Sequence, residues 1–394
     1  MKELKVIVLM FIVLLLTACS KNEDSPEETQ PVINVYVYSP DHPTITRGDI
    51  GNVNPIDNTI NESLITSLQI WVFEHGTNTL VSYYQPETVR NLNDEKGVTY
   101  QLNVSEAFAK ADPKPTVDVY VVANVTSKNC GLSYDKNTTR ATLEGALIGT
   151  GYFGLSPLTT TVPAEGLPMS GVLRDVAVTG SAPVFKISSV KLTRAVSKLR
   201  FIFSKDVNTS VKITGIKLGV KLDENDNLDL DQDNNIQPES QIPTEEFLFL
   251  KADHSLYHIG ETYETGGTAL FTGELAINSN DDPIKYTYQP GQSAQDYENL
   301  IAEGLKKVPA ELSQVGPFYL RESNKQLSGV ITYQIGDAAE KNAVFKMKTA
   351  GDFSRNHTWI VYAYYGVDGM QVITVYSQDW QELNSTNPHN VYNW

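Results

Sequence analysis

A cysteine near the start of the chain has the sequence context of a lipid attachment site. Residues Leu16-Thr17-Ala18-Cys19 match a lipobox, at which a signal peptide is removed and the thiol of the new N-terminal cysteine is lipidated. The charged opening Met1-Lys2-Glu3-Leu4-Lys5 and the apolar run 6–16 form a secretory signal. This run of eleven residues is too short to cross a hydrocarbon core, which needs about 20 residues. We therefore expect cleavage before Cys19 and a lipid on its sulfur; the alternative is an ordinary signal peptide with a chance cysteine.

The peptide bond between Arg47 and Gly48 is the second position where chemistry is expected. The twenty-five residues between Lys21 and Arg47 contain no Lys or Arg, so an arginine-specific protease has one site in this stretch. Prolines before the bond and glycines after it predict an exposed loop that a protease can enter. Cutting there would release the lipid anchor together with residues 33–38.

Familiar catalytic and metal-binding patterns are absent from the sequence. The six histidines are scattered without an H-E-x-x-H pair, and no G-x-S-x-G elbow, phosphate loop or dinucleotide fingerprint occurs. Asp229, Asp231 and Asp233 alternate as in a calcium loop, but Asn234 and Ser240 stand where Gly and Glu are required, so a solvated acidic turn is the better interpretation. We expect no catalytic residue, no metal site, no cofactor and no enzyme activity, with a carboxylate pair of a glycosidase left open.

The charge balance and the cysteine count restrict the partners and the means of stabilisation. Forty-seven acidic and thirty-one basic residues give a formal charge of −16, which argues against nucleic acid and anionic membrane surfaces. The only cysteines are Cys19 and Cys130, so once Cys19 carries lipid no disulfide can form within the chain. The fold must therefore be held together without disulfides.

The elements that must position these residues are mostly strands. Short apolar or alternating runs recur between Gly, Asn, Asp and Pro, and such spacing predicts an all-β fold of antiparallel β-sandwiches. The predicted strands are 33–38, 67–73, 117–125, 184–192, 198–203, 211–220, 329–335, 343–348, 358–365 and 370–376. Helical periodicity is limited to the short segment 105–111 and to 294–307.

The first predicted strand alternates as a core-facing strand should. Ile33, Val35 and Val37 lie on one face, and the opposite face is polar or aromatic. Exposing three aliphatic side chains at roughly 1.5–3 kcal/mol each leaves a deficit of about 5–9 kcal/mol. Removal also leaves an unpaired sheet edge, which invites another strand. A strand from a second molecule could fill the groove by β-strand addition.

The C-terminus offers a candidate donor strand. Residues 371–376 alternate, with Val372, Thr374 and Tyr376 on one face, and Tyr392 and Trp394 would point the same way on a strand. Two aromatic side chains two residues apart suit pockets along a groove. The alternative is that 371–376 is an ordinary last strand of its own domain and that 391–394 folds back on it.

The length of the chain predicts two domains. Without the signal peptide about 375 residues remain, enough for two domains of roughly 100–200 residues each. We assign 1–18 to the signal peptide, 19–47 to a tether with the removable strand, 48–185 to an N-terminal β-sandwich domain and 186–394 to a C-terminal β-sandwich domain with the donor strand. The boundary is expected near 180–189, within about fifteen residues.

Seven motifs in a fixed order carry a resemblance to a known family. They are the lipobox 16–19, Thr46-Arg47, Ile65-Thr-Ser-Leu-Gln-Ile-Trp-Val-Phe73, Val119-Tyr-Val-Val-Ala-Asn124, Leu167-Pro-Met-Ser-Gly171, Leu192-Thr-Arg-Ala-Val-Ser-Lys198 and Phe353-Ser-Arg-Asn-His-Thr-Trp359. With these motifs the chain resembles the fimbrillin family of Bacteroidales type V pili over nearly its whole length. Each motif is weak alone, and their common order is the specific signal.

The resemblance implies a fold, a processing route and partners. It implies two transthyretin-like sandwiches, a lipoprotein precursor at the outer membrane, cleavage after Arg47 by an arginine-specific protease, and polymerisation by strand exchange into an extracellular fimbrium. The partners are then other fimbrial subunits, the protease, the outer membrane before cleavage, and a host or bacterial surface receptor to which the fimbrium adheres. A non-cleaved anchor subunit is one alternative. A surface glycan-binding lipoprotein is another, suggested by the aromatic residues Trp71, Tyr83, Tyr84 and Trp380.

Overall fold

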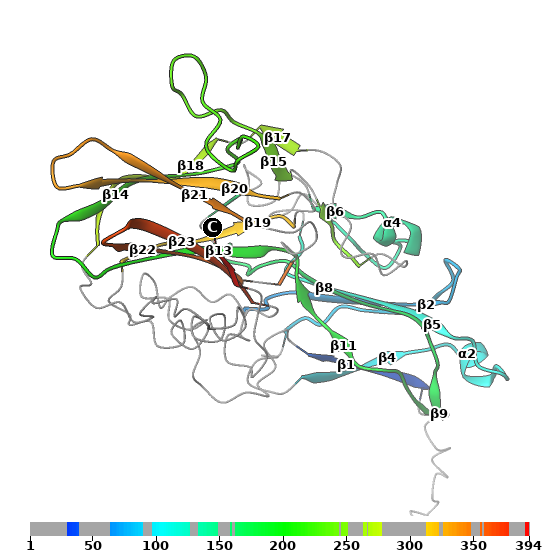
Figure 1. Cartoon of the computed structure of the whole chain (residues 1–394). Helices are drawn as coiled ribbons and strands as arrows, with labels where there is room; N and C mark the ends of the chain where they lie inside the picture. The colour runs from blue at the N-terminus through cyan, green and yellow to red at the C-terminus, as the bar shows by residue number, and fades with distance from the viewer. Residues whose placement is uncertain are drawn as a thin grey trace, which may run out of the picture.

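The computed structural model describes most of the strand-forming part of the chain. The described residues are 30–38, 64–89, 97–126, 133–148, 158–159, 162–243, 246–250, 263–265, 267–277, 313–322, 326–347, 355–356, 358–377 and 391–393. Within them the protein is mostly β-strand, with two short helices, and Figure 1 shows the four larger sheets as successive layers. The predicted all-β sandwich class is confirmed.

Two five-stranded sheets form the N-terminal sandwich, at the bottom of Figure 1. Their strands are β1 (Val32–Tyr38), β2 (Leu68–Glu74), β3 (Leu80–Tyr84), β4 (Val98–Asn103), β5 (Val117–Ala123), β8 (Met169–Val176), β9 (Thr179–Ser181), β10 (Val184–Lys186), β11 (Val190–Lys191) and β12 (Thr193–Arg194). In one sheet β1 pairs with β4 on one side and with β10 and β11 on the other, and β9 pairs with β10. In the second sheet the order is β12-β8-β5-β2-β3.

The sheet built on β2 and β5 is buried on both faces. One face contributes Ile70 and Val121 to the core beneath β1. The opposite face contributes Trp71 and Tyr120 to a cluster that also contains Phe249 from a later part of the chain. A sheet covered on both faces needs apolar side chains in both directions, which accounts for the continuous apolar runs in these two strands.

Two further sheets form the C-terminal sandwich. Their strands are β7 (Leu158–Thr159), β13 (Ser197–Lys205), β14 (Val211–Leu218), β18 (Thr268–Ala276), β19 (Ser313–Leu320), β20 (Ser328–Ile335), β21 (Lys341–Lys346), β22 (Thr358–Gly366), β23 (Gly369–Ser377) and β24 (Val391–Asn393). One sheet has the order β24-β23-β22-β13-β19-β7, and the other has the order β18-β14-β20-β21. Phe201, Ile216 and Trp359 are among the buried residues of the core between them.

Short pairings and buried charges connect the two sandwiches. β6 (Leu147–Ile148) pairs with β16 (Glu246–Phe247), and β7 pairs with β19. Arg355 is fully buried at this junction, where its Nη1 donates to the carbonyl of Leu248 at 2.8 Å and its Nε donates to Glu322 at 3.4 Å. Its Nη2 lies 3.7 Å from Glu246, and burial raises the pKa of both carboxyl groups. The junction therefore depends on a buried ionic cluster.

Some predicted elements change in detail. The segment 105–111 contains the predicted helix, α2 (Glu106–Lys110), with Ser105 as its N-cap, and the structure adds α4 (Arg140–Glu144) and the small hairpin of β15 (Ser240–Pro243) with β17 (Tyr263–Thr265). The single strand predicted over 184–192 is wrong, because it is divided into β10, β11 and the residues between them. Not all pairing is antiparallel: β1 runs parallel to β10 and β11, and β13 runs parallel to β22. The predicted helix 294–307 lies outside the described residues.

Strand pairing passes from one sandwich to the next between Arg194 and Ser197. Residues 184–194, on both sides of the boundary predicted at 185/186, pair within the N-terminal sheets. The assignment of the chain to two independent domains stays a prediction.

We predict that Arg355→Leu destabilises the protein by about 3–5 kcal/mol, because it removes the guanidinium that hydrogen-bonds to buried Glu322 and one of the two buried cations, with Arg321, that act on Glu246. Urea unfolding of the chain from residue 20 measures this. The control is Lys110→Ala, which removes only an exposed pair with Glu106 and should change the free energy of unfolding by less than about 0.5 kcal/mol. Equal effects of the two variants would contradict a structural role for the buried cluster.

Candidate functional site

The candidate site is the position occupied by β1, the strand predicted to be removable. β1 is an inner strand of its sheet. Six of its residues, from Val32 to Val37, pair antiparallel with β4, and the other edge of β1 pairs with β10 and β11. Backbone hydrogen bonds also join the carbonyl of Pro183 to Val32 N at 2.8 Å and the carbonyl of Tyr38 to Leu192 N at 3.0 Å. All three neighbouring strands would therefore lose a partner if β1 were absent.

The inner face of β1 belongs to the hydrophobic core. Ile33, Val35 and Val37 each have 0% of their surface exposed and pack in the same cluster as Ile70 and Val121 of the facing sheet. The intervening residues are only half-buried, so the strand has the alternation that the sequence predicts. The predicted inward face is confirmed, while the removal of this strand stays a prediction.

The covalent connection of β1 to the other strands of its sandwich runs only through the residues that follow Tyr38. β1 is the first described strand, and the next described residue after Tyr38 is Leu64, which leads into β2. Any break between residues 39 and 63 therefore leaves β1 held only by hydrogen bonds and apolar contacts. The predicted lipidation site Cys19 and the predicted cleavage positions Arg47 and Gly48 lie outside the described residues.

The chain that follows this connection is fixed by Asn124. This residue is buried and has a φ of 60°. Its Nδ2 donates to the carbonyls of Leu64 at 2.6 Å and Leu167 at 2.8 Å, and its Oδ1 accepts from Thr66 N at 2.9 Å. The sequence analysis placed this residue only in a family motif, because the three partners are distant in the chain. After a cut at Arg47, these three hydrogen bonds of Asn124 would hold the start of β2 in place.

The C-terminal candidates lie in the C-terminal sandwich. β23 pairs with β22 at nine positions and with β24 at three. Val372 is buried in the core of that sandwich. Thr374 pairs with Tyr392 in the backbone register, Tyr376 pairs with Trp359, and Trp394 lies outside the described residues. Within this chain the pairing follows the alternative in which the last residues fold back on β23, and donation to a second molecule stays a prediction.

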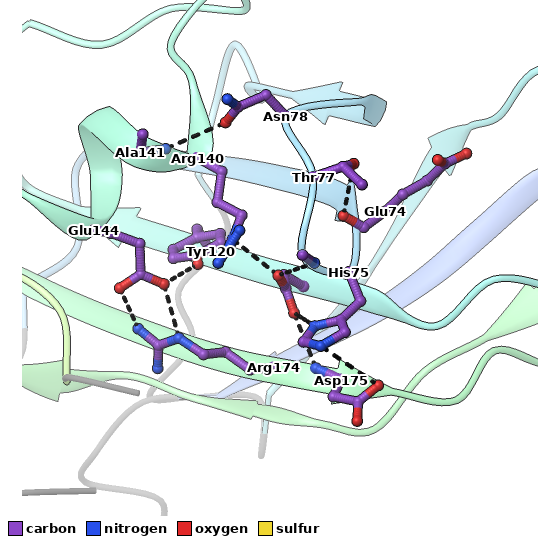
Figure 2. A network of polar contacts seen from close by, with 12 residues as sticks. Glu74, His75, Thr77, Asn78, Tyr120, Arg140, Ala141, Glu144, Arg174 and Asp175 are labelled. Carbon is purple, nitrogen blue, oxygen red and sulfur yellow. Dashed lines mark hydrogen bonds and ion pairs between the residues drawn. The ribbon is translucent and has the colours of Figure 1, made fainter. Parts of the chain in front are cut away.

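A polar network lies on the face of the β2 and β5 sheet that is turned away from β1 (Figure 2). Asp118 of β5 is fully buried. It accepts hydrogen bonds from His75 Nδ1 at 2.7 Å, Asp175 N at 2.9 Å and Gly76 N at 3.3 Å, and its Oδ2 lies 3.0 Å from Arg140 Nε. Burial opposes ionisation of Asp118, but these hydrogen bonds outweigh burial and hold its pKa below the usual value.

The second half of this network centres on Glu144 of α4. Arg174 binds it through two hydrogen bonds of 2.8 and 2.7 Å, and the hydroxyl of Tyr120 donates to it. Arg174 also donates to the carbonyl of Leu250 at 2.7 Å. Burial raises the pKa of Tyr120, and the Glu144 carboxylate raises it further. Figure 2 shows both halves side by side across β5 and β8, so the network fastens α4 to the sheet.

The His75–Asp118 pair has the residue types of a catalytic dyad but lacks a nucleophile. The Nε2 of His75 lies 4.0 Å from the carboxylate of Asp175, and no Ser, Thr or Cys side chain is among its recorded partners in the described part of the chain. Covalent catalysis by a His–Asp pair needs a hydroxyl or thiol of the protein within hydrogen-bond reach of the imidazole. The geometry therefore indicates a structural network.

The acidic turn is organised by its own backbone. Asp231 Oδ1 accepts from the backbone N of Asp233 and Asn235, each at 2.8 Å, and Asp223 Oδ1 accepts in the same way from Asn225 and Asn227. Among the described residues no group of three His, Cys, Asp or Glu side chains could hold a metal ion. The structure thus adds an eight-residue repeat of this turn, which the sequence analysis did not identify.

Of the aromatic residues behind the glycan-binding alternative, the three that the structure describes pack against other side chains. Trp71 has 0% of its surface exposed, and its Nε1 donates to the carbonyl of Asp135 at 2.9 Å. The ring of Tyr83 packs 5.4 Å from that of Trp71, and the ring of Tyr84 lies 5.8 Å from that of Tyr100. Trp71 as an exposed binding residue is wrong, and Trp380 lies outside the described residues.

No helix in the described part of the chain is long and apolar enough to cross a membrane.

Comparison with known proteins connects this geometry to a family. Residues 51–218 match the family model described as major fimbrial subunit protein (FimA). No curated protein matches the chain. Solved structures with partial similarity include a putative cell adhesion protein from Parabacteroides distasonis, at 11% identity and TM-score 0.47, which covers 93% of this chain and 96% of its own.

Two further solved structures have lower TM-scores. The tip fimbrial protein Mfa3 from Porphyromonas gingivalis is 11% identical with TM-score 0.46, covering 93% of this chain and 100% of its own. A fimbrial assembly protein from Parabacteroides distasonis is 13% identical with TM-score 0.41, covering 88% of this chain and 95% of its own. The family assignment therefore depends on the family model, and the ordered motifs in the sequence indicate the same family.

We predict that Ile33→Ala destabilises the uncleaved protein by about 2–5 kcal/mol, because it leaves a cavity in the N-terminal core. The control is Thr99→Ala, on the exposed face of the neighbouring strand β4, with an expected change of less than about 0.5 kcal/mol. Urea unfolding measures both. A loss as small as that of the control would show that β1 contributes little to the core.

We predict that Asp118→Asn lowers stability at neutral pH and that this loss shrinks on acidification. The folded-state pKa of Asp118 is depressed, so its contribution is present above the unfolded-state pKa of about 3.9 and is lost as pH falls through the folded value. The free energy of unfolding should be measured from pH 7 to pH 2.5, with the exposed Glu340→Gln as control. A difference between wild type and Asp118→Asn that is independent of pH would contradict this account.

Proposed function

We propose that this chain, whose residues 51–218 match the family model of the major fimbrial subunit, is a structural subunit of an extracellular fimbrium that polymerises by strand exchange. The family match supports the fimbrial role, and it indicates a structural protein rather than an enzyme. One observation carries the polymerisation mechanism: β1 is an inner strand with a fully buried face, yet it is attached to its sandwich through a single connection.

Processing begins with a lipoprotein precursor. Cys19 carries the lipid that holds the precursor at the outer membrane, and residues 20–31 form the tether to β1. An arginine-specific protease cuts between Arg47 and Gly48, within the connection between β1 and β2. The cut separates both the lipid and β1 from the remaining chain, so membrane release and opening of the groove are one event.

The vacated groove is the driving force for assembly. Loss of Ile33, Val35 and Val37 exposes core surface worth about 5–9 kcal/mol at roughly 1.5–3 kcal/mol per side chain. β4 on one side and β10 with β11 on the other also lose their backbone partners. A strand of a second subunit restores both interactions. The C-terminal residues Val372, Thr374, Tyr376, Tyr392 and Trp394 are the candidate donors, and the resulting fimbrium carries adhesion to a host or bacterial surface receptor.

We predict that trypsin converts the chain from residue 20 into a product that begins at Gly48 and forms ladders in unheated gels. Arg47→Gln should keep β1 attached and stay monomeric, because the groove remains filled. Lys21→Gln is the control, since a cut at Lys21 leaves β1 attached, and this variant should polymerise like the wild type. N-terminal sequencing and unheated electrophoresis measure the two steps. A product that starts at Gly48, has lost β1 and stays monomeric at every concentration would contradict strand exchange.

The non-cleaved anchor subunit is the principal alternative. N-terminal sequencing of protein recovered from the cell surface separates the two roles. A start at Gly48 supports the polymerising subunit, whereas a blocked, lipidated Cys19 supports the anchor.

A further inference from the structure

The outer face of β1 makes a close contact with the backbone at Gly97. Gly97 immediately precedes β4 and has a φ of +133°, a conformation that side chains rarely adopt. A Cβ at this position would lie 2.5 Å from both Cζ and Oη of Tyr36 and 2.9 Å from Cβ of Tyr38. The absence of a side chain at Gly97 is therefore what allows two aromatic residues of β1 to cover the chain there.

The register explains why the contact falls on this pair. Tyr36 lies opposite Thr99, and Val37 lies opposite Val98, so Gly97 is the next residue toward Tyr38. The rings of Tyr36 and Tyr38 are 6.1 Å apart on the same face. Aromatic side chains placed over a glycine in a neighbouring strand cover backbone that the glycine leaves bare. Removal of β1 uncovers Gly97 at the same time as it opens the core.

The end of the chain repeats the pattern of the strand that leaves. Val35-Tyr36-Val37-Tyr38 has two aromatic residues two positions apart, and Val391-Tyr392-Asn393-Trp394 has the same spacing with the same leading valine. On an extended strand both aromatic pairs share one face. An incoming strand with this pattern sets aromatic side chains at Gly97 whether it runs along β1 or in the reverse direction.

The position of β24 makes it the more available of the two C-terminal strands. It pairs with β23 at three positions only, from Ile373 to Val375, at the edge of its sheet. β23 pairs with β22 at nine positions and places Val372 in the core. Transfer of β24 to another molecule therefore breaks far fewer interactions than transfer of β23.

We propose that Gly97 is the specificity-determining residue of the groove, and that it selects the aromatic pair Tyr392 and Trp394 from a second copy of this chain. The inference depends on the proposed strand exchange and adds the register and the recognition element. In this register Asn393 takes the place of Val37 in the core, so the donor binds less tightly than β1 does. The precursor consequently retains its own strand until the protease cuts.

The donor side is tested with a synthetic peptide of residues 386–394 and the trypsin-cleaved protein that has lost β1. Fluorescence anisotropy should detect binding of the labelled peptide. Replacing both Tyr392 and Trp394 by Ala should weaken binding about tenfold or more. Tyr392→Phe should bind like the natural peptide, and Asn393→Val should bind more tightly because it fills the place of Val37 with an apolar side chain.

The acceptor side is tested with Gly97→Ala and the control Gly76→Ala. Gly76 also has a positive φ, +70°, but a Cβ there meets nothing within 4 Å. Cleaved Gly97→Ala should bind the peptide about tenfold more weakly, whereas Gly76→Ala should bind like the wild type. In the uncleaved protein, Gly97→Ala should lower the melting temperature less when Tyr36 is also Ala, since the two shortest contacts, with Cζ and Oη of Tyr36, are then removed while the contact with Cβ of Tyr38 remains. This measurement tests the contact even if cleaved Gly97→Ala does not stay folded.

The outcomes distinguish a failure of recognition through Gly97 from a failure of strand exchange. If the natural peptide binds and the peptide without both aromatic residues binds equally well, recognition through Gly97 is wrong while strand addition stands. Additive effects of Gly97→Ala and Tyr36→Ala on the melting temperature would overturn the contact itself. If cleaved protein neither binds the natural peptide nor forms ladders, strand exchange and the selection by Gly97 are both wrong.

Discussion

The N-terminal sandwich depends on having a strand in one particular place. The position of β1 has backbone partners on both edges, β4 on one side and β10 with β11 on the other, and a core on its inner face. Three aliphatic side chains fill that core, and two tyrosines cover the outer face near Gly97. Since these demands are independent of the identity of the molecule that supplies the strand, a chain whose first strand is lost can meet them only with a strand from elsewhere.

The facing sheet is held by contacts that do not involve β1. Asn124 fixes the start of β2 through three hydrogen bonds. The Asp118 and Glu144 clusters fasten α4 to β5 and β8 from the other side. The buried charges around Arg355 join this sandwich to the next. The sheet that faces β1 is therefore fixed by polar contacts on the side away from β1.

Local patterns in the sequence predicted the strands well and their partners poorly. Alternation in residues 33–38 correctly predicted the buried face of β1. The continuous apolar run at Trp71 correctly predicted a strand, and this run is continuous because its sheet is covered on both faces. The interruption between β10 and β11, the hydrogen bonds of Asn124 and the pairing of β6 with β16 were not predicted. Each depends on residues far apart in the chain, and no periodicity records such a contact. The aromatic alternation of Tyr36 and Tyr38 was visible in the sequence, but its meaning required the position of Gly97.

The pairing of β1 along both edges also determines how the structure responds to mechanical load. A force applied at residue 30 and directed along the strand is parallel to its axis, so the antiparallel pairs with β4 and the parallel pairs with β10 and β11 are sheared together. Bonds loaded together share the force, whereas bonds peeled from one end break one after another. A strand in this position resists being drawn out lengthwise far better than an edge strand resists being peeled away. The geometry on which the proposed exchange depends thus makes the filled groove a strong joint under tension.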